Sequence, residues 1–383
     1  MDKDERVQVL RDLIQINSVN GNEAEVAAYL KQLFDKHGIE AQVEEFGDRR
    51  ANLLVDLGSG DKVLGITGHM DTVALGDESK WTYPPLAAKV VGDKLYGRGA
   101  ADMKSGLAAQ VIALIELHDE GRLPEGHIRF IATAGEEYGT PGADRLEKAG
   151  VARDLSALVV GEPTSGDVVF AHSGSYNYRI KSVGKSVHSS EPERGLSALD
   201  ALVDYCLKER TLFDDAPEDP YLGKIKHSVT IFKAGDQVNT IPDYAEIRGN
   251  IRATRAFGND KVTARIKKAI EEINAQGKAQ LSFELLHDWR PVASDPKSDF
   301  VQDALAASKA AFADYPEHRT PELKTTNGAT DASVFVKSNP DLPVILLGAD
   351  DWSIAHQIDE YTTISSFQAV TDAYKQIIRD YFK

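Results

Sequence analysis

Apolar positions in the N-terminal part of the chain follow two alternating spacings, one typical of helices and one typical of strands. Helical spacing, with apolar side chains three or four residues apart, occurs over residues 7–14, 24–33 and 105–117. Short continuous apolar runs occupy residues 53–55, 63–66, 128–132 and 157–160. Because buried strands that alternate with helices are typical of βαβ units, this part of the chain predicts an α/β domain with a mostly parallel sheet.

The pattern changes near residue 175. Residues 176–183 alternate polar and apolar side chains, as a strand with one solvent-facing side does. The next segments predict a helix, two strands, a helix and a strand, at residues 197–208, 228–232, 245–252, 261–276 and 280–286. This β-α-β-β-α-β order predicts a ferredoxin-like α+β domain.

After residue 296 the α/β pattern resumes. A helix is predicted at 299–313, a buried strand at 342–347 and an amphipathic helix at the end of the chain. The smaller domain is therefore expected to be an insertion in the larger one. We expect the larger domain to comprise residues 1–174 and 291–383, and the insertion to comprise residues 175–290.

Composition narrows the classes of function. The chain of 383 residues has 60 acidic and 44 basic side chains and a net charge of −16. A surface this negative repels phosphate backbones and anionic lipids, so we expect neither a nucleic-acid nor a membrane partner. No uncharged apolar stretch reaches the roughly 18 residues of a membrane span, and the single cysteine, Cys206, permits no intrachain disulfide. We therefore expect a cytoplasmic protein.

Histidines and carboxylates follow several of the predicted strands. His69 follows the run at 63–66, Glu136 and Glu137 follow the run at 128–132, and Glu162 follows the run at 157–160. Ligand sites in open α/β sheets gather at the carboxyl ends of the strands. Asp71 lies two residues after His69 and so points to the same side, where its carboxylate could orient the imidazole of a metal ligand.

Two further candidates complete this set. Asp102 lies in a glycine-rich turn before the helix at 105–117, and His356 follows the last buried strand. The turn fits neither a dinucleotide-binding motif, whose third glycine is replaced by Asp102, nor a phosphate-binding loop, because Met103 precedes Lys104. Taken singly, each candidate is better explained as a turn, cap or surface residue. Together they form the inventory of a hydrolytic two-metal site.

Roles can be assigned within this inventory. Glu136 and Glu137 are adjacent, so on an extended segment they would point in different directions, and one could bind metal while the other faces the substrate. A general base must stay free of the metal, and Glu136 could fill that role. His188, in the insertion, is either a plain surface histidine or a group that polarises a substrate carbonyl.

These motifs, in this order, resemble those of the M20 metallopeptidases, which include acetylornithine deacetylases, succinyl-diaminopimelate desuccinylases, aminoacylases and dipeptidases. The resemblance covers essentially the whole chain. It implies two zinc ions, with cobalt or manganese as substitutes, one held by His69 and Glu162 and the other by Glu137 and His356. Asp102 would bridge the two ions. The resemblance further implies that Glu136 is the general base and that Asp71 orients His69.

The resemblance also assigns residues outside the metal ligands. His188 matches a histidine that acts on the substrate carbonyl, and the insertion is expected to form a lid and a homodimer, in which His188 could act on the partner's site. The positions that match substrate contacts are Asn239, Arg252, Gly328 and Thr330.

Within this family the chain looks most like the desuccinylase-like proteins of Gram-positive bacteria, with residues 80–85 and 188–190 as the motifs that point there. The resemblance therefore implies removal of the succinyl group from N-succinyl-LL-2,6-diaminopimelate, a step of lysine and diaminopimelate biosynthesis. One departure is that residues 172–175 read His-Ser-Gly-Ser where Gram-negative desuccinylases carry an arginine pair. An acetylornithine deacetylase, a dipeptidase or aminoacylase, and an inactive metal-binding homologue remain alternatives.

Overall fold

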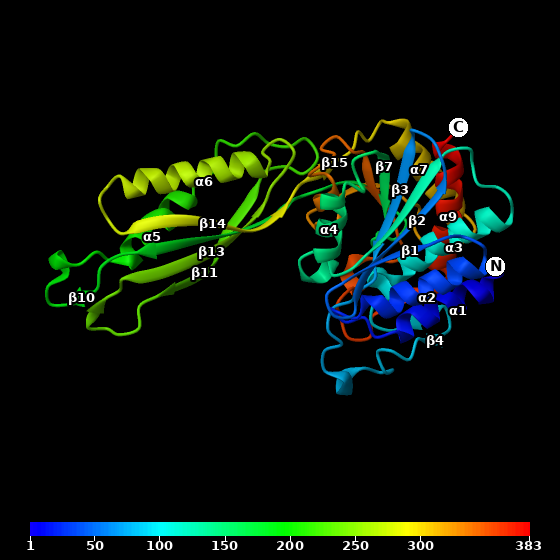
Figure 1. Cartoon of the computed structure of the whole chain (residues 1–383), viewed down its shortest axis with the longest axis horizontal. Coiled ribbons are helices and arrows are strands. Elements are labelled where there is room, and N and C mark those ends of the chain that lie inside the picture. The colour runs from blue at the N-terminus through cyan, green and yellow to red at the C-terminus, as the bar shows by residue number, and fades with distance from the viewer. The chain divides into compact units, whose positions relative to one another are not determined.

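The computed structural model describes all 383 residues, which divide into two compact units (Figure 1). The first unit comprises Met1–Ala171, Ala293–Lys324 and Thr330–Lys383, and the second comprises His172–Val292 and Thr325–Ala329. The chain thus leaves the first unit near residue 171 and returns to it near residue 293. The functions predicted for these segments, a catalytic domain and an inserted lid or dimerisation domain, remain predictions.

A nine-stranded sheet forms the centre of the first unit. Its order is β1-β2-β6-β3-β7-β17-β8-β15, with β16 paired to β8. The four strands β6, β3, β7 and β17 are mutually parallel, whereas β1, β2 and β8 pair antiparallel with their neighbours. The strands are β1 (Gln42–Phe46), β2 (Arg50–Gly58), β3 (Val63–His69), β6 (His127–Thr133), β7 (Leu155–Val160), β8 (Val168–His172), β15 (Val292–Ala293), β16 (Leu323–Thr326) and β17 (Val344–Leu346).

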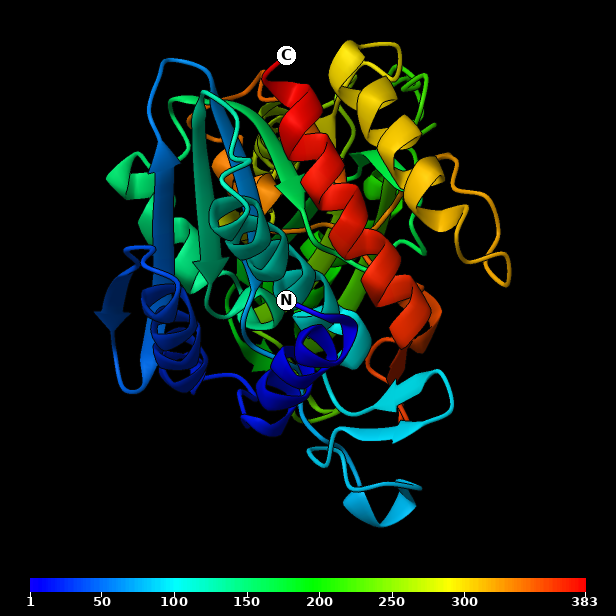
Figure 2. The ribbon, with the colours of Figure 1, turned by 90° about the vertical axis from the view of Figure 1, so that its right-hand side faces the viewer.

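Helices cover this sheet. They are α1 (Lys3–Gln15), α2 (Glu23–Lys36), α3 (Ser105–Asp119), α4 (Pro141–Ala149), α7 (Asp299–Phe312), α8 (Ala332–Phe335) and α9 (Ile364–Tyr381). Figure 2 shows α1, α3, α9 and α7 in front of the sheet, whereas α4 lies on its other side (Figure 1). The central strand β3 is buried at all seven positions, which explains its uninterrupted apolar sequence. The helix α3 is buried from its first residue to Leu117, because it packs against both the sheet and α9.

A small three-stranded antiparallel sheet also belongs to the first unit. It consists of β4 (Lys89–Val91), β5 (Lys94–Tyr96) and β18 (Tyr361–Thr363), in the order β18-β5-β4. The pairing of Tyr361 with Tyr96 brings the segment after His356 next to the segment before Asp102. Three-residue strands carry no usable periodicity, so the sequence did not indicate this sheet.

The second unit contains a four-stranded antiparallel sheet in the order β11-β13-β9-β14. Its elements are β9 (Ser175–Val183), α5 (Ala198–Glu209), β11 (Lys226–Ala234), β13 (Tyr244–Arg252), α6 (Asn259–Asn274) and β14 (Gln280–Trp289), and a separate two-stranded ladder joins β10 (Val187–His188) to β12 (Thr240–Ile241). Alternate residues of β9, such as Tyr176 and Tyr178, enter a core shared with α5 and α6. The predicted β-α-β-β-α-β order and the predicted fold class are both confirmed.

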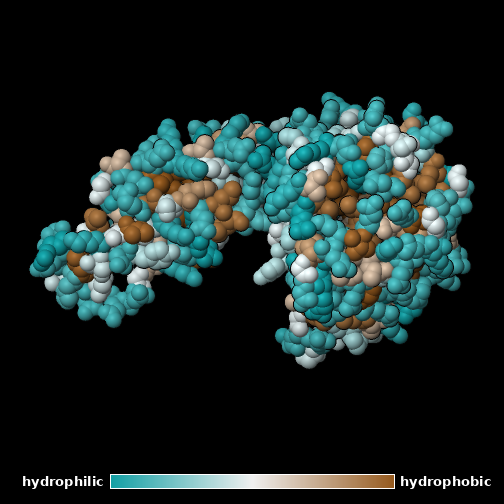
Figure 3. Space-filling view, in the orientation of Figure 1, coloured by the Kyte–Doolittle hydropathy of each residue, from teal (hydrophilic) through white to brown (hydrophobic).

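Several elements escaped the sequence pattern. The strand β1 has a sequence with two glutamates and little alternation, β8 was not separated from the loop before it, and the short helix α4 begins with Pro-Gly. The surface is mainly hydrophilic on the visible face of each unit (Figure 3), in line with the net charge of −16. None of the helices combines the length and the apolar character that crossing a membrane requires.

Candidate metal centre

Three neighbouring parallel strands bring candidate ligands to one edge of the large sheet. The strand β3 lies between β6 and β7, and all three run in the same direction. His69 is the last residue of β3, Glu162 lies two residues after β7, and Glu136 and Glu137 follow β6 after a short turn. Because the carboxyl ends of parallel strands meet at the same edge, these side chains converge there.

Asp102 lies between two histidines. Its Oδ1 is 3.0 Å from Nε2 of His69, and its Oδ2 is 3.3 Å from Nε2 of His356. His356 Nε2 also lies 2.6 Å from Oε1 of Glu137, and His69 Nε2 lies 3.9 Å from Oε1 of Glu162. The five residues therefore form two adjoining groups, His69 with Glu162 and Glu137 with His356, on either side of the Asp102 carboxylate. We call these groups the first and the second half-site.

The electrostatics of this cluster favour a cation. Burial, followed by the negative charge of Asp102, raises the pKa of Glu162 well above its usual value. Burial also raises the pKa of Glu136, opposed by the charge of His69 and reinforced by the nearby carboxylates of Glu162 and Asp331. Hydrogen bonds to Asp102 and Glu137 raise the pKa of His356 to about 10. The raised pKa values of the two glutamates follow from burying several carboxylates close together, and a bound cation would offset this cost.

The donor set fits divalent metal ions. Imidazole nitrogens and carboxylate oxygens are the ligands that zinc commonly takes, at about 2.0 to 2.2 Å from the ion, which places tetrahedral ligands roughly 3.3 Å apart. The separations between 2.6 and 3.9 Å are close to that spacing. In addition, Oε2 of Glu162 is buried and has no hydrogen-bond partner. A buried carboxylate oxygen without a donor is costly unless a cation neutralises it.

His69 is oriented by the main chain of Asp71. Its Nδ1 donates to the carbonyl oxygen of Asp71 at 3.0 Å, which turns Nε2 toward Oδ1 of Asp102 at 3.0 Å. The Asp71 carboxylate lies 3.6 Å from Nδ1 and accepts hydrogen bonds from the main-chain N–H groups of Gly135, Glu136 and Glu137, at 2.8, 3.0 and 3.2 Å. Asp71 thus connects the end of β3 to the turn that carries the two glutamates.

The expectation of an extended segment at Glu136 and Glu137 is wrong. These residues form a single 3₁₀ turn, Glu136–Tyr138, which follows Gly135 in the left-handed region at φ 77°. Glycine tolerates this φ, and it lets the chain turn sharply at the end of β6. The two glutamates nevertheless face different surroundings, because Glu136 is buried and Glu137 contacts His356.

The remaining predicted site residues are divided between the units. Thr330 is buried in the first unit, where its hydroxyl accepts from the N–H of Ala332. His188, Asn239, Arg252 and Gly328 belong to the second unit. The imidazole of His188 is exposed and lies 2.8 Å from the hydroxyl of Ser190. Arg252 ends β13, and partial burial lowers the pKa of its guanidinium.

Sequence reasoning missed some residues of the cluster. Asp331 is buried, its Oδ2 accepts from the hydroxyl of Thr133, and burial raises its pKa to about 7. Arg98 and Glu360 form a buried ion pair behind Asp102 and His356. The sequence alone gave little reason to select Asp331, Arg98 or Glu360, because none of them belongs to a recognisable pattern of charged residues.

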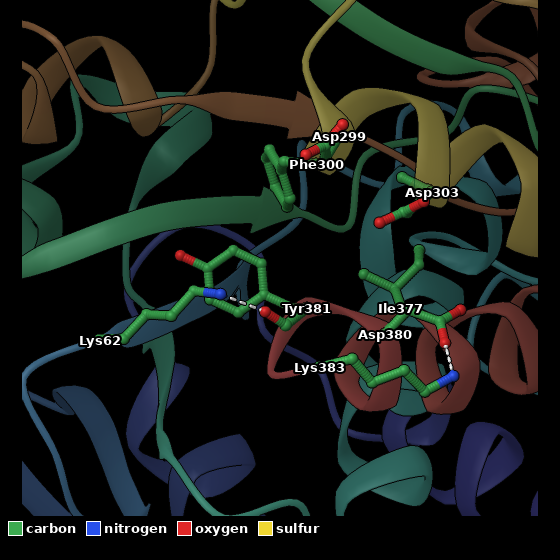
Figure 4. Close-up of a pocket in the computed structure, with 9 residues that line it drawn as sticks. Lys62, Asp299, Phe300, Asp303, Ile377, Asp380, Tyr381 and Lys383 are labelled. Atoms are coloured by element: carbon green, nitrogen blue, oxygen red, sulfur yellow. Dashed lines mark hydrogen bonds and ion pairs between the residues drawn. The ribbon is translucent and has the colours of Figure 1, made fainter.

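A separate cavity of about 590 Å³ lies at the opposite edge of the large sheet. Its lining includes Lys62, Tyr381 and Lys383, and Figure 4 shows Lys62 beside Tyr381. Lys62 lies immediately before β3, and His69 is the last residue of β3. The seven residues of this strand therefore place the two about 20 Å apart. The cavity is therefore not part of the ligand cluster.

The fold and the histidine–carboxylate cluster define a metal-dependent hydrolase. A family model described as peptidase family M20/M25/M40 matches residues 65–380, and the chain belongs to this family. It is an enzyme of the class that hydrolyses linear amides with the help of metal ions.

Relatives and solved structures agree with this assignment. A protein of Staphylococcus aureus (strain MRSA252), described as a probable succinyl-diaminopimelate desuccinylase, is 35% identical over 99% of this chain and 98% of its own. The succinyl-diaminopimelate desuccinylase of Wolbachia pipientis wMel is 30% identical over 98% of this chain and 93% of its own. Aminopeptidase PepT of Bacillus cereus has the same fold, with a TM-score of 0.78, 23% identity and complete coverage of both chains. The YXEP protein of Bacillus subtilis, described as a dinuclear metal-binding peptidase of the M20 family, gives a TM-score of 0.71 at 17% identity, over 98% and 97% of the two chains.

Proposed function

We propose that this protein is a dinuclear zinc amidohydrolase that removes the acyl group from an N-acyl amino acid, and that its substrate is N-succinyl-LL-2,6-diaminopimelate. The observation that carries the two-metal part is the position of Asp102, with one carboxylate oxygen toward His69 and the other toward His356. The names of relatives that match the whole chain support the choice of substrate.

In this proposal each half-site would hold one zinc ion. His69 and Glu162 would supply ligands for the first and Glu137 and His356 for the second, with Asp102 available to both. Cobalt or manganese could replace zinc, because the donors are imidazoles and carboxylates without thiolates. When bound, the ions polarise the scissile carbonyl and make the attacking water more acidic.

The protein's own groups then carry the proton and hold the substrate. Glu136 removes a proton from the attacking water and delivers it to the leaving amine, so that water and amide become a carboxylate and a free amine. Asp71 keeps Glu136 in place through the main-chain hydrogen bonds to its turn. His188 donates a hydrogen bond to the developing oxyanion, and Arg252 pairs with a substrate carboxylate, with Asn239, Gly328 and Thr330 as further contacts.

The proposed setting is the cytoplasm, in lysine and diaminopimelate biosynthesis. The protein would act as a homodimer joined through the inserted domain predicted at residues 175–290. Its partner in the reaction is a small anionic substrate.

One observation favours an alternative substrate. His172 is buried and Ser173 bonds to Asn327, so this segment offers no cationic side chain for a succinyl carboxylate. A deacetylase acting on N-acetylornithine, or a dipeptidase or aminoacylase, would need no such group. The same catalytic centre would serve each of these reactions.

The test is amine release by the zinc-loaded protein from N-succinyl-LL-2,6-diaminopimelate, N-acetylornithine and a dipeptide panel. We expect the succinyl substrate to be preferred, and we expect Glu136→Gln to lower turnover by at least about 100-fold while zinc stays bound. Preference for another substrate would show that the enzyme is a deacetylase or a dipeptidase of the same family and not a desuccinylase. Full turnover by Glu136→Gln would exclude Glu136 as the base.

A further inference from the structure

A buried ion pair lies directly behind the shared carboxylate and the second histidine. Arg98 and Glu360 are 3% and 1% exposed, and Nη1 of Arg98 donates to Oε2 of Glu360 at 2.5 Å. Arg98 precedes the segment that carries Asp102, and Glu360 follows the loop that carries His356. The pair therefore joins two segments that are 262 residues apart in sequence.

Glu360 fixes the main chain at Asp102. Its Oε1 accepts hydrogen bonds from the N–H groups of Ala101 and Asp102, at 3.0 and 3.1 Å. The Asp102 segment is irregular, with φ −117° and ψ 100° at Asp102 itself, and a hydrogen bond from the N–H of Lys104 to the carbonyl oxygen of Gly99 closes the turn around it. The direction of the shared carboxylate also depends on an acceptor supplied from elsewhere in the fold.

Arg98 fixes the main chain at His356. Its Nη2 donates to the carbonyl oxygen of His356 at 3.4 Å, and its Nε donates to the carbonyl oxygen of Ala74 at 3.2 Å. The guanidinium also lies over the ring of Trp81, 5.2 Å from the ring centroid. Several independent contacts therefore hold this one side chain.

The two histidines differ in how they are held. The side chain of His69 is 1% exposed and bonds to the main chain of Asp71, whereas that of His356 is 49% exposed. Packing therefore contributes little to the position of the His356 imidazole, which depends on its contacts with Glu137 and Asp102 and on the direction of its backbone. That backbone is in the left-handed region at φ 62°, a conformation that costs a histidine free energy and persists only where neighbouring contacts enforce it.

We infer that Arg98 and Glu360 are positioning residues that set the distance between Asp102 and His356 and thereby the affinity of the second half-site for its metal ion. This inference rests on the proposed function, because it assumes that the half-sites bind metal. The contacts of the pair with the ligand-bearing segments are to the main chain of Ala101, Asp102 and His356. Its effect passes through the two backbone segments that it holds.

The test is a zinc titration of the metal-free full-length protein in competition with a chromophoric chelator. We expect two binding steps in the wild type, and His356→Ala identifies the step that belongs to the second half-site. In Arg98→Met that step should weaken about 10- to 100-fold, as is typical when a group that orients a metal ligand is lost. The step that belongs to His69 and Glu162 should change much less.

A matched control separates this effect from general destabilisation. Arg6 and Glu116 form another buried ion pair in the same unit, 8% and 3% exposed, which joins α1 to α3. Arg6→Met should lower the melting temperature and leave both zinc affinities at the wild-type values. Arg98→Lys keeps a charge beside Glu360 but cannot make all of the contacts of Arg98. The zinc affinity of its second half-site should therefore lie between the values of the wild type and Arg98→Met.

Equal changes of both zinc steps in Arg98→Met and Arg6→Met would overturn the inference. If Arg98→Met does not fold, Arg98→Lys and Glu360→Gln provide the test, because both keep a polar group at their position. Wild-type zinc affinities in both of these variants would also overturn the inference. Failure of the proposed function would appear differently, as a wild-type protein that binds no zinc.

Discussion

His172 is a fully buried histidine whose proton binding couples the stability of the fold to pH. Burial lowers its pKa to about 4, although a hydrogen bond to the carbonyl oxygen of Ser173 opposes this shift. The unfolded chain binds a proton near the ordinary pKa of about 6.5, so between these two values only the unfolded state is protonated. Stability should therefore fall as the pH decreases through this range.

The variant His172→Gln isolates this contribution. Between about pH 7 and about pH 4.5 the wild type should lose about 2 kcal/mol more of unfolding free energy than the variant, as measured by urea unfolding. Other carboxylates titrate in the same range, but they are common to both proteins. If the two proteins lose equal stability over this range, His172 is not the group responsible.

Single residues of the metal centre were predictable to different degrees. His69 and Glu162 could be found because each follows an apolar strand, and parallel strands end at one edge. Asp331 and Glu360 could not be found, because their importance arises only from contacts with segments far away in sequence, such as the hydrogen bond from Thr133 to Asp331. No local pattern records such contacts.

At the scale of elements, a close contact between α3 and the segment after β7 keeps two ligand-bearing loops together. A Cβ added to Gly106, the second residue of α3, would lie 1.8 Å from the carbonyl oxygen of Gly161. Gly161 is adjacent to Glu162, and α3 begins three residues after Asp102. A side chain at this position must push one of these ligands away from the other.

Gly106→Ala should accordingly destabilise the protein by about 2 to 3 kcal/mol, as overpacking of a rigid contact does, and should also weaken zinc binding. Gly258→Ala is the control, since a Cβ there meets nothing closer than 4.0 Å and the loss should be about 1 kcal/mol or less. Urea unfolding and zinc titration measure the two effects. Equal stability of the two variants would show that the contact can relax without cost.

Elements with strong periodicity were predicted well, and short ones were not. The helix predicted at 197–208 is Ala198–Glu209, and Ser197 caps it by accepting from the N–H of Asp200. The strands β4, β5 and β18 have three residues each and exist because they pair with one another. Their stability comes from long-range pairing, which a local window cannot register.

At the scale of the whole molecule, the sequence predicted both folds and the order in which the chain enters them. The alternation of helices and apolar runs gave the large sheet as mostly parallel, but not the antiparallel strands β1, β2 and β8 that flank its parallel centre. Strand order depends on which apolar faces meet in three dimensions, and similar sequences permit several orders. Similarly, the ligands were predictable as an inventory and the family resemblance implied a bridging role for Asp102, whereas the distances from its two carboxylate oxygens to His69 and His356 required the structure.

We propose that one carboxylate, that of Asp102, joins two metal ions at this edge of the sheet. The most direct test is the zinc content per chain after removal of metal and reloading, measured by elemental analysis for the wild type and three variants. The account predicts two zinc ions in the wild type, one in His69→Ala, one in His356→Ala and none retained in Asp102→Ala. A wild type with a single zinc ion, or an Asp102→Ala protein that keeps two, would contradict it.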